Sequence, residues 1–282
     1  MDLSPEAIRE VVERALSEDV GRGDLTTLAL IPAEARAEAR MVMREAGVVA
    51  GLPVLAAVFA AVDPALVVTA RVADGTVAGA GAVIAEVAGP ARGILTGERV
   101  ALNLVQRLSG IATLTARYVA AVGDLPARVL DTRKTTPGLR ALEKYAVRVG
   151  GGTNHRFGLH DAILIKDNHL ALLAAQGVGV GDAVRRAQAA AGPMVRIEVE
   201  ADTVAQARAA ADAGANLILL DNMAPDELRA AVATIGGRAK LEASGGITLE
   251  TICAVAETGV DYISVGALTH SARALDIGLD IV

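Results

Sequence analysis

The chain lacks several features that would assign it to a familiar class of protein. Among its 282 residues there is one cysteine, Cys253, no tryptophan, and an aromatic content of only 2%. One cysteine excludes an internal disulfide framework and a thiolate metal cage within the chain, and we expect this side chain to be buried as a small apolar group. Few aromatic residues and many alanines favour a helix-rich protein over an all-β protein.

A basic excess, a secretion leader and a long apolar run are missing as well. The formal net charge is −6, which disfavours a nucleic-acid partner. Residues 1–6 contain neither the basic nor the apolar segment of a signal peptide. The longest uncharged run, residues 47–62, is shorter than the ~20 residues that a membrane span needs. We therefore expect a soluble, cytoplasmic protein with no membrane partner and no nucleic acid.

The hydrophobic pattern changes halfway along the chain. Residues 4–20 form an amphipathic pattern behind the capping residue Ser4, and residues 33–95 contain short apolar runs between glycines. Residues 96–122 predict a helix with a break or bend at Gly110. In the second half, apolar segments alternate with helical patterns, which predicts a parallel sheet with crossover helices. The predicted strands lie at residues 128–131, 162–166, 195–200, 217–221, 240–244 and 262–266.

These patterns predict an α/β fold class with two domains. Residues 1–108 are expected to form an N-terminal α+β domain, with the tail 272–282 packing on it. Residues 109–271 are expected to form a barrel-like parallel α/β domain of six or seven strands. Because six strands can be recognised rather than eight, we expect an incomplete barrel.

Polar residues stand at the carboxyl end of one predicted strand after another. With a period of two, Glu198 and Glu200 share a face of their strand, and Glu242 and Ser244 share a face of theirs. Asp221 ends the predicted strand that lies between these two in the sequence. Solvated strand ends would explain any single case. The repetition favours an active site at the mouth of a barrel, where the βα loops converge.

Basic side chains gather in one part of the second half. Arg133 and Lys134 follow directly on a strand end, His155 and Arg156 follow a pliable loop of three glycines, and Lys166 closes an apolar strand. Each group alone would also fit a basic surface turn or a structural ion pair. Together, in an acidic protein, they indicate a pocket for a small polyanion, because guanidinium and ammonium groups suit carboxylates and phosphates.

Acidic and glycine-rich strand ends complete the candidate site. Glu200 and Asp221 have too few histidines or cysteines nearby for a zinc site. From the residues alone they could hold ribose hydroxyls, coordinate magnesium, stabilise positive charge on a sugar carbon, or act as the pair of a retaining glycosidase. Residues 244–246 and 266–269 offer small side chains and exposed amides, which is typical of phosphate binding.

Segments along nearly the whole chain resemble the quinolinate phosphoribosyltransferase family, also named nicotinate-nucleotide pyrophosphorylase (carboxylating). The motifs DTRKT at residues 131–135 and GGGTNHR at residues 150–156 are specific when they occur together. The remaining matching segments are EDVGRGDLTT at 18–27, NLVQRLSGIAT at 103–113, LILLDN at 217–222, EASGGI at 242–247 and DYISVGALTHSARALD at 261–276.

The resemblance implies an enzyme that joins quinolinate to phosphoribosyl pyrophosphate with magnesium, releasing carbon dioxide and pyrophosphate, in NAD synthesis. It implies three catalytic residues, Lys134, Glu200 and Asp221, with the two acids at the ribose hydroxyls and at magnesium, either directly or through the substrate. The quinolinate-binding residues that it implies are Arg133, His155, Arg156 and Lys166, with Thr132 beside them. The phosphate-binding residues that it implies are Ser244, Gly245, Gly246, Val265, Gly266 and Ala267.

The resemblance also bears on assembly and on the alternatives. Arg99 matches an arginine that family members donate across a dimer interface, which implies a homodimer or a larger homo-oligomer with a shared active site. Three alternatives remain at this point. They are a sibling on the same scaffold, such as the molybdenum-transport-associated homologue or an enzyme that prefers nicotinate, a non-catalytic anion-binding barrel, and a glycosidase that leaves the basic cluster unexplained.

Overall fold

The computed structural model describes residues 3–282, which form two compact units. Unit 1 contains the chain up to Ala116 together with Lys134–Gly151 and Ala267–Val282, and unit 2 contains Arg117–Arg133 and Gly152–Gly266. The sequence predicted a simpler division at residues 108 and 109. Segment 134–151 joins unit 1 because its side chains bond there, as when the Tyr145 hydroxyl donates to Asp74 at 2.6 Å.

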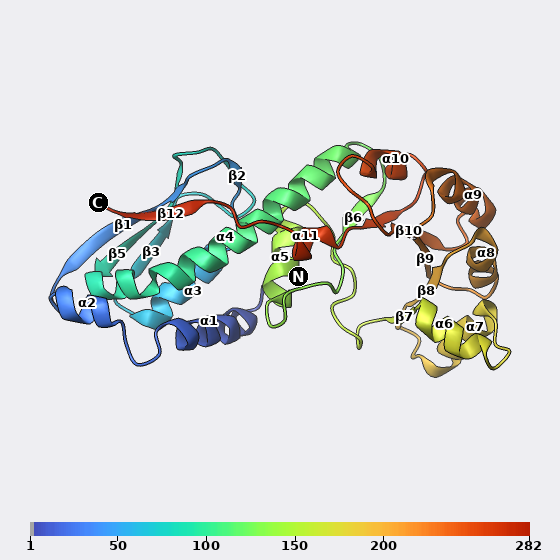
Figure 1. Cartoon of the computed structure of the whole chain (residues 1–282), viewed down its shortest axis with the longest axis horizontal. Coiled ribbons are helices and arrows are strands. Elements are labelled where there is room, and N and C mark those ends of the chain that lie inside the picture. The colour runs from blue at the N-terminus through green and yellow to red at the C-terminus, as the bar shows by residue number, and fades with distance from the viewer. Residues whose placement is uncertain (1–2) are drawn as a thin grey trace. The chain divides into compact units, whose positions relative to one another are not determined.

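Unit 1 is built on a four-stranded antiparallel sheet, as the α+β prediction for this part of the chain requires (Figure 1). The spatial order is β12-β1-β5-β3, so the last strand of the chain pairs with the first. Alternate residues of β1 are buried, including Met41 and Met43, and form one wall of the core. The strands are β1 (Arg36–Met43), β3 (Val67–Ala70), β5 (Val83–Pro90) and β12 (Ile277–Ile281). A separate pair joins β2 (Gly47–Val48) to β4 (Val77–Ala78).

The helices of unit 1 begin where the sequence provides caps. Ser4 accepts the backbone N–H of Ala7 at the start of the first helix, as predicted, and Asp24 caps the second in the same way. The second helix begins at Leu25, within the segment EDVGRGDLTT. The helices are α1 (Pro5–Asp19), α2 (Leu25–Leu30), α3 (Leu52–Val62), α4 (Ala91–Val122), α5 (Arg140–Val149) and α11 (Ala267–His270), with most of α4 in this unit.

Two glycines of this unit permit close packing of backbones. Gly110 does not break α4, which is continuous from Ala91 to Val122. A Cβ atom at Gly110 would lie 2.0 Å from the carbonyl oxygen of Arg273, and one at Gly150 would lie 2.4 Å from that of Ala112. Gly150 was expected to lend pliability to a ligand loop, but its contact shows that it lets the end of α5 approach α4.

Unit 2 is a six-stranded parallel sheet, which confirms the predicted fold class (Figure 1). The spatial order is β6-β11-β10-β9-β8-β7. The first two strands along the chain, β6 and β7, are therefore the two edges of this barrel-like sheet, which stays open between them. Segment 153–155 lies at that opening, where Thr153 forms a parallel bridge to Leu130 of β6. The strands are β6 (Arg128–Leu130), β7 (Ile163–Ile165), β8 (Ile197–Ala201), β9 (Leu217–Asp221), β10 (Lys240–Ser244) and β11 (Tyr262–Ser264).

Helices follow the strands of unit 2 and cover their apolar side chains. They are α6 (Asp167–Ala174), α7 (Val180–Ala190), α8 (Val204–Asp212), α9 (Pro225–Ile235) and α10 (Ile252–Ala256). Cys253 lies on α10 and is exposed, so the prediction that it is buried was wrong. It points away from the buried face that α10 forms with Ile252 and Val255. Within residues 3–282, no helix is both long enough and apolar enough to span a membrane.

The close approach at Gly110 generates a stability prediction. Gly110→Ala should lower the free energy of unfolding by about 1–3 kcal/mol, because the new methyl group overlaps a backbone oxygen that cannot rotate away. Gly79→Ala is the matched control in the same unit, since a Cβ atom there meets nothing within 4 Å. Chemical denaturation monitored by circular dichroism checks both variants. Equal stability of the two would contradict the packing role of Gly110.

Candidate functional site

The candidate site of unit 2 lies along the carboxyl ends of its strands. Glu200 is near the end of β8, Asp221 ends β9, and Ser244 ends β10. Because the strands are parallel and adjacent, these ends meet at one edge of the sheet. The same unit contains most of the residues expected from the sequence, namely Thr132, Arg133, His155, Arg156, Lys166, Glu200, Asp221, Ser244, Gly245, Gly246, Val265 and Gly266.

Two arginines form the cationic part of this edge. The Nε atoms of Arg133 and Arg156 are buried and have no hydrogen-bond partner among residues 3–282. One terminal nitrogen of Arg156 donates to the carbonyl oxygen of Ala162 at 2.9 Å, which anchors the side chain. Burial, and then the positive charge of Arg133, lower the pKa of Arg156. Paired guanidinium groups with unused buried N–H groups are suited to a ligand that carries several negative charges.

The acidic part of the edge is made by Glu200, Asp202 and Asp221, whose carboxylate oxygens lie within 4.8 Å of one another. Burial, and then the charge of Asp221, raise the pKa of Glu200, although nearby Lys166 acts in the opposite direction. Such a group favours a positive charge beside it. The main-chain N–H of Lys166 donates to Nδ1 of His169, which fixes the turn from which the lysine side chain extends.

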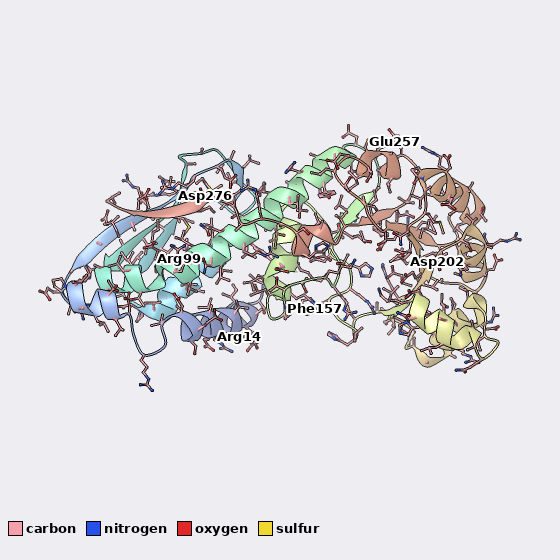
Figure 2. The ribbon with its side chains drawn as sticks, in the orientation of Figure 1. Arg14, Arg99, Phe157, Asp202, Glu257 and Asp276 are labelled. Atoms are coloured by element: carbon pink, nitrogen blue, oxygen red, sulfur yellow. The ribbon has the colours of Figure 1, made fainter. Side chains whose placement is uncertain are left out.

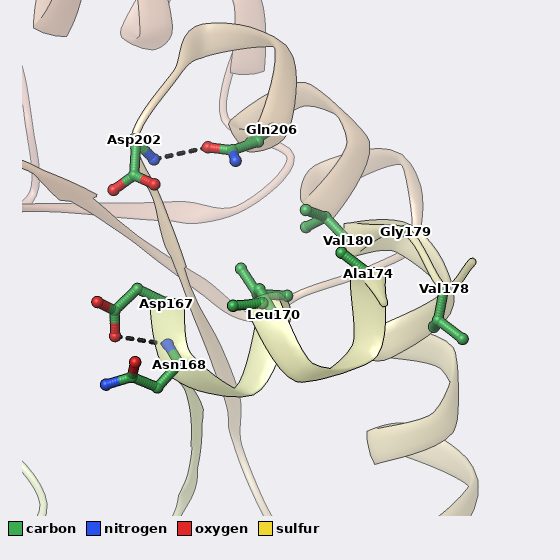
Figure 3. A pocket seen from close by; sticks show the side chains of 10 residues that line it. Asp167, Asn168, Leu170, Ala174, Val178, Gly179, Val180, Asp202 and Gln206 are labelled. Carbon is green, nitrogen blue, oxygen red and sulfur yellow. Dashed lines mark hydrogen bonds between the residues drawn. The ribbon is translucent and has the colours of Figure 1, made fainter. Parts of the chain in front are cut away.

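A pocket of about 420 Å³ opens beside these acids between α6 and the start of α8 (Figure 3). Asp167 and Asp202 lie on its wall, and the charges of both raise the pKa of Glu200. The side chain of Gln206 accepts the backbone N–H of Asp202 at 2.8 Å and so holds that wall in place. No local sequence pattern predicts this pocket, because its walls come from α6 and from the start of α8, which only folding brings together.

The turn after β10 has the backbone geometry that a phosphate site needs. Gly245 and Gly246 have φ angles of 99° and 60°, in the left-handed region that favours glycine. A Cβ atom at Gly245 would lie 2.1 Å from Oδ1 of Asn222, so no larger residue fits. Asn222 itself has a φ of 55° and donates its backbone N–H to the carbonyl oxygen of Ser244. The turns after β9 and β10 are therefore fixed against each other.

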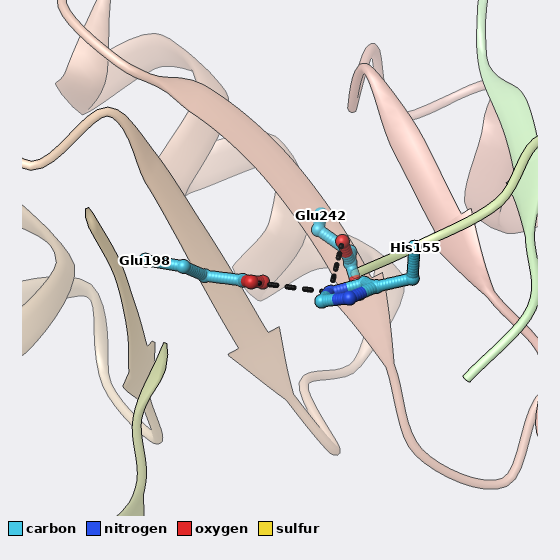
Figure 4. Close-up of side chains that lie close together, drawn as sticks. All are labelled: His155, Glu198 and Glu242. Atoms are coloured by element: carbon cyan, nitrogen blue, oxygen red, sulfur yellow. Dashed lines mark ion pairs between the residues drawn. The ribbon is translucent and has the colours of Figure 1, made fainter. Parts of the chain in front are cut away.

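Two buried glutamates belong to the site although no role was predicted for them. Glu198 on β8 and Glu242 on β10 lie 3.1 Å and 3.6 Å from Nε2 of His155 (Figure 4). Burial, and then the charge of Glu198, raise the pKa of Glu242 to about 7, although His155 and the hydroxyl of Ser264 oppose this. Strand alternation had placed both glutamates on the polar face. Their pairing with a histidine far away in the sequence could not be read from that pattern.

The remaining predicted residues, Arg99, Lys134 and Ala267, belong to unit 1. Arg99 is an exposed side chain on α4 (Figure 2). Lys134 is exposed as well, and its backbone is held from within its own unit, because the hydroxyl of Thr269 donates to its carbonyl oxygen at 2.7 Å. Ala267 begins the short helix α11, which also carries Thr269.

A buried ion pair supports the same segment of unit 1. Glu143 is fully buried and accepts hydrogen bonds from Arg107 at 2.8 Å and from the backbone N–H and the hydroxyl of Thr136 at 3.0 and 2.8 Å. Arg107 also donates to the carbonyl oxygens of Thr269 and Ala272. The turn that follows Lys134 is thereby tied to three other segments of the unit, and this rigidity limits the motion of the lysine backbone.

A parallel α/β sheet with cations, acids and exposed amides along one edge defines an enzyme domain for small anionic substrates. Residues 24–109 and 111–280 match the models of the N-terminal and C-terminal domains of quinolinate phosphoribosyl transferase. The chain belongs to the quinolinate phosphoribosyltransferase family, as its motifs predicted.

Individual relatives agree with this family over the whole chain. The nicotinate-nucleotide pyrophosphorylase (carboxylating) of Mycobacterium leprae is 49% identical over 288 residues, which cover 99% of each chain. The crystal structure of NadC from Streptococcus pyogenes superposes with a TM-score of 0.94 at 44% identity and covers 100% of this chain and 99% of that one. The nicotinate-nucleotide pyrophosphorylase of Francisella tularensis gives 0.92 at 36% identity, covering 100% and 98%.

The hydrogen bond between Thr269 and Lys134 generates a prediction about turnover. Thr269→Val should lower kcat about tenfold to a hundredfold with the family's substrates, because a small displacement of a positioned cation is costly. Thr269→Ser keeps the hydroxyl and should therefore retain most of the wild-type kcat. Steady-state kinetics check both variants.

Thr258→Val is the matched control for this substitution. The Thr258 hydroxyl is also buried and also donates to a carbonyl oxygen, that of Val255, at 2.7 Å. It should cost similar stability without changing kcat. An equal loss of kcat in Thr258→Val, or none in Thr269→Val, would contradict the positioning role.

Proposed function

We propose that this chain transfers the phosphoribosyl group of phosphoribosyl pyrophosphate to quinolinate, with decarboxylation, to give nicotinate mononucleotide, carbon dioxide and pyrophosphate in NAD synthesis. One observation carries the choice of a dianionic acceptor: Arg133 and Arg156 both present buried, unpartnered Nε–H groups among residues 3–282. Quinolinate has two adjacent carboxylates, which would satisfy two such groups. The family names of the relatives support the same reaction.

Quinolinate binding depends on the cations of unit 2. Arg133 and Arg156 offer forked donors for the carboxylates, and Lys166 adds a point charge near Glu200. Burial, and then the positive charge of Arg133, lower the pKa of Arg156, and an anion that enters the pocket relieves the repulsion between the two guanidinium groups. The free energy of this relief contributes to binding. Binding at both carboxylates also orients the ring nitrogen of quinolinate, because a planar acid held at two points has little freedom to rotate.

Glu200 and Asp221 are assigned to the sugar. Attack of the ring nitrogen on the anomeric carbon passes through a state with positive charge on the sugar. Both carboxylates lie at the edge where that charge would develop, and burial and then the charge of Asp221 raise the pKa of Glu200, so a positive charge beside it is favourable. Preorganised negative charge of this kind stabilises the transition state more than the ground state.

The phosphates are assigned to backbone amides and to Lys134. The turns at residues 244–246 and 265–267 follow β10 and β11 and consist of small residues, which is the kind of loop that holds phosphate at strand ends. Lys134 is assigned to the departing pyrophosphate. Once the ring nitrogen carries the sugar it is positively charged and accepts the electron pair left by carbon dioxide, so this step needs no general acid or base.

Magnesium fits the acidic side of the site. Glu200, Asp202 and Asp221 supply oxygen ligands within 4.8 Å of one another, and oxygen is the donor that magnesium prefers. When bound, the ion would neutralise charge on the pyrophosphate group. A homodimer or larger homo-oligomer, with Arg99 supplied by a second copy, is part of the same proposal. The cytoplasmic location expected from the sequence stays a prediction.

The reaction itself is the first test. Purified protein with quinolinate and phosphoribosyl pyrophosphate should release carbon dioxide and pyrophosphate in equal amounts, faster with magnesium than with a chelator. Nicotinate, which lacks one carboxylate, should be a poor acceptor because it leaves part of the arginine pair unpaired. Activity on nicotinate with none on quinolinate would end the proposal. Quinolinate binding without pyrophosphate release would favour a non-catalytic anion-binding protein.

The shared site is tested by mixing inactive variants. Arg99→Ala and Lys166→Ala should each be nearly inactive, because each removes a cation assigned to the substrates. If Arg99 acts in the site of a second copy, a refolded mixture should regain about a quarter of wild-type activity, since mixed dimers contain one intact site. Turnover of the mixture against each variant alone checks this. Mixtures that remain inactive would place Arg99 and Lys166 in one chain's site.

A further inference from the structure

Asp131 is a buried carboxylate at the end of β6 to which the proposed reaction assigns no role. The residue is completely buried, and it stands two residues before Arg133 in the chain. A carboxylate that leaves water costs free energy unless hydrogen bonds replace its hydration. The reason for keeping this charge inside the protein must therefore lie in the bonds that it accepts.

Two of these bonds come from the segment that leads to Arg156. Oδ1 of Asp131 accepts the backbone N–H of His155 at 2.8 Å, and Oδ2 accepts the side-chain amide of Asn154 at 2.6 Å. A carboxylate only accepts, so the amide must turn its N–H group towards it. Both oxygens of Asp131 thus hold the short stretch of chain that immediately precedes Arg156.

The backbone of the same stretch is joined to β6 like an added parallel strand. The N–H of Thr153 donates to the carbonyl oxygen of Val129 at 2.8 Å, and the N–H of Asp131 donates to that of Thr153 at 3.2 Å. In a regular parallel pair the next bond would run from the N–H of His155 to the main-chain carbonyl of Asp131. The side-chain carboxylate accepts this N–H instead, so it forms the last rung of the ladder.

This last rung connects the two arginines that are assigned to quinolinate. Arg133 lies two residues beyond Asp131, and Arg156 lies one residue beyond His155. Burial, and then the charge of Arg133, lower the pKa of Arg156, so the two guanidinium groups repel each other. Repulsion favours any motion that separates like charges. The spacing of the two groups therefore depends on how firmly their backbone segments are joined.

We propose that Asp131 is a positioning residue that sets the spacing of the Arg133 and Arg156 guanidinium groups and thereby selects an acceptor with two adjacent carboxylates. This role rests on the proposed function and adds to it the origin of acceptor selectivity. Asp131 acts through the backbone of His155 and through Asn154, without touching the substrate. Supports of this kind hold a binding site in its productive geometry, which a rigid planar dianion needs at both carboxylates.

An exchange of the two bonded side chains tests the role by steady-state kinetics. Asp131→Asn keeps the size of the side chain and one oxygen for the N–H of His155, but it sets an amide N–H against that of Asn154. KM for quinolinate should rise about tenfold to a hundredfold, because displaced cations bind poorly, while KM for phosphoribosyl pyrophosphate stays within about threefold. Adding Asn154→Asp returns an acceptor opposite the new amide and should bring KM for quinolinate back to within about fivefold of wild type.

The direction of the change separates positioning from charge. Asp131→Asn also removes a negative charge close to a site for an anion, and this loss by itself would favour quinolinate and lower its KM. A higher KM therefore reports displaced cations. The double variant has the same net charge as the wild type, so its recovery reports the restored hydrogen bond.

Asp261→Asn is the matched control in the same sheet. Asp261 accepts the backbone N–H of Leu241 at 2.9 Å and the ammonium group of Lys240, so it also joins neighbouring strands, but at their amino ends. This variant should lower Tm and leave KM for quinolinate unchanged. Asn154→Ala removes one donor and keeps the carboxylate, so it decides the matter if Asp131→Asn does not fold, and it should raise KM for quinolinate about threefold to tenfold.

Inhibition by substrate analogues gives a readout of selectivity. In Asp131→Asn the inhibition constant of benzene-1,2-dicarboxylate should rise in parallel with KM for quinolinate, because this analogue also needs both guanidinium groups. Benzoate, with one carboxylate, needs one of them, and its inhibition constant should change by less than about threefold. Equal losses for both analogues would show that spacing is not what Asp131 controls.

Three kinetic results would contradict the positioning role. They are an unchanged or lower KM for quinolinate in Asp131→Asn, equal increases in KM for both substrates, and a folded double variant without recovery. An equal rise of KM for quinolinate in Asp261→Asn would reduce Asp131 to a structural residue. A wild-type protein that releases no pyrophosphate with quinolinate would refute the proposed function itself, before any variant is compared.

Discussion

The buried carboxylate of Asp131 is the interaction on which the cationic half of the site depends. It stands where β6 ends, at the side of the parallel sheet that stays open, and accepts the N–H of His155 and the amide of Asn154. Strand edges leave backbone groups unpaired, and segment 153–155 pairs with β6 instead of leaving this edge bare. The same attachment that closes the edge delivers His155 and Arg156 to the carboxyl ends of the strands.

Charge balance explains why the site can be strongly cationic in an acidic protein. Burying two arginines side by side is unfavourable, and the lowered pKa of Arg156 reflects that cost. Glu198 on β8 compensates part of it, because its negative charge acts to raise the pKa of Arg156. It does not occupy the two Nε–H groups, which remain for a ligand. In unit 1, Glu143 supports the turn after Lys134 by the same principle, a fully buried acid satisfied by several donors.

Much of the fold was predictable because its signals are local. All six predicted strands of unit 2 are present near their predicted places, since each is an apolar run bounded by turn residues. Where the sequence misled, a distant segment was the cause. Gly110 looked like a helix break, but Arg273, far along the chain, requires its small size. Cys253 looked like a core residue, but its helix turns a different face to the sheet.

By itself the sequence determined the parallel α/β unit, the cations of the DTRKT and GGGTNHR motifs, and the acids at the strand ends. These follow from periodicity and from chemistry carried by neighbouring residues. Only the tertiary structure decided which of these groups are already satisfied. It placed His155 beside Glu198 and Glu242, and within the described residues 3–282 it left the Nε–H groups of Arg133 and Arg156 without a partner. Hydrogen bonding and burial depend on partners from other strands, and no local pattern encodes their distance or direction.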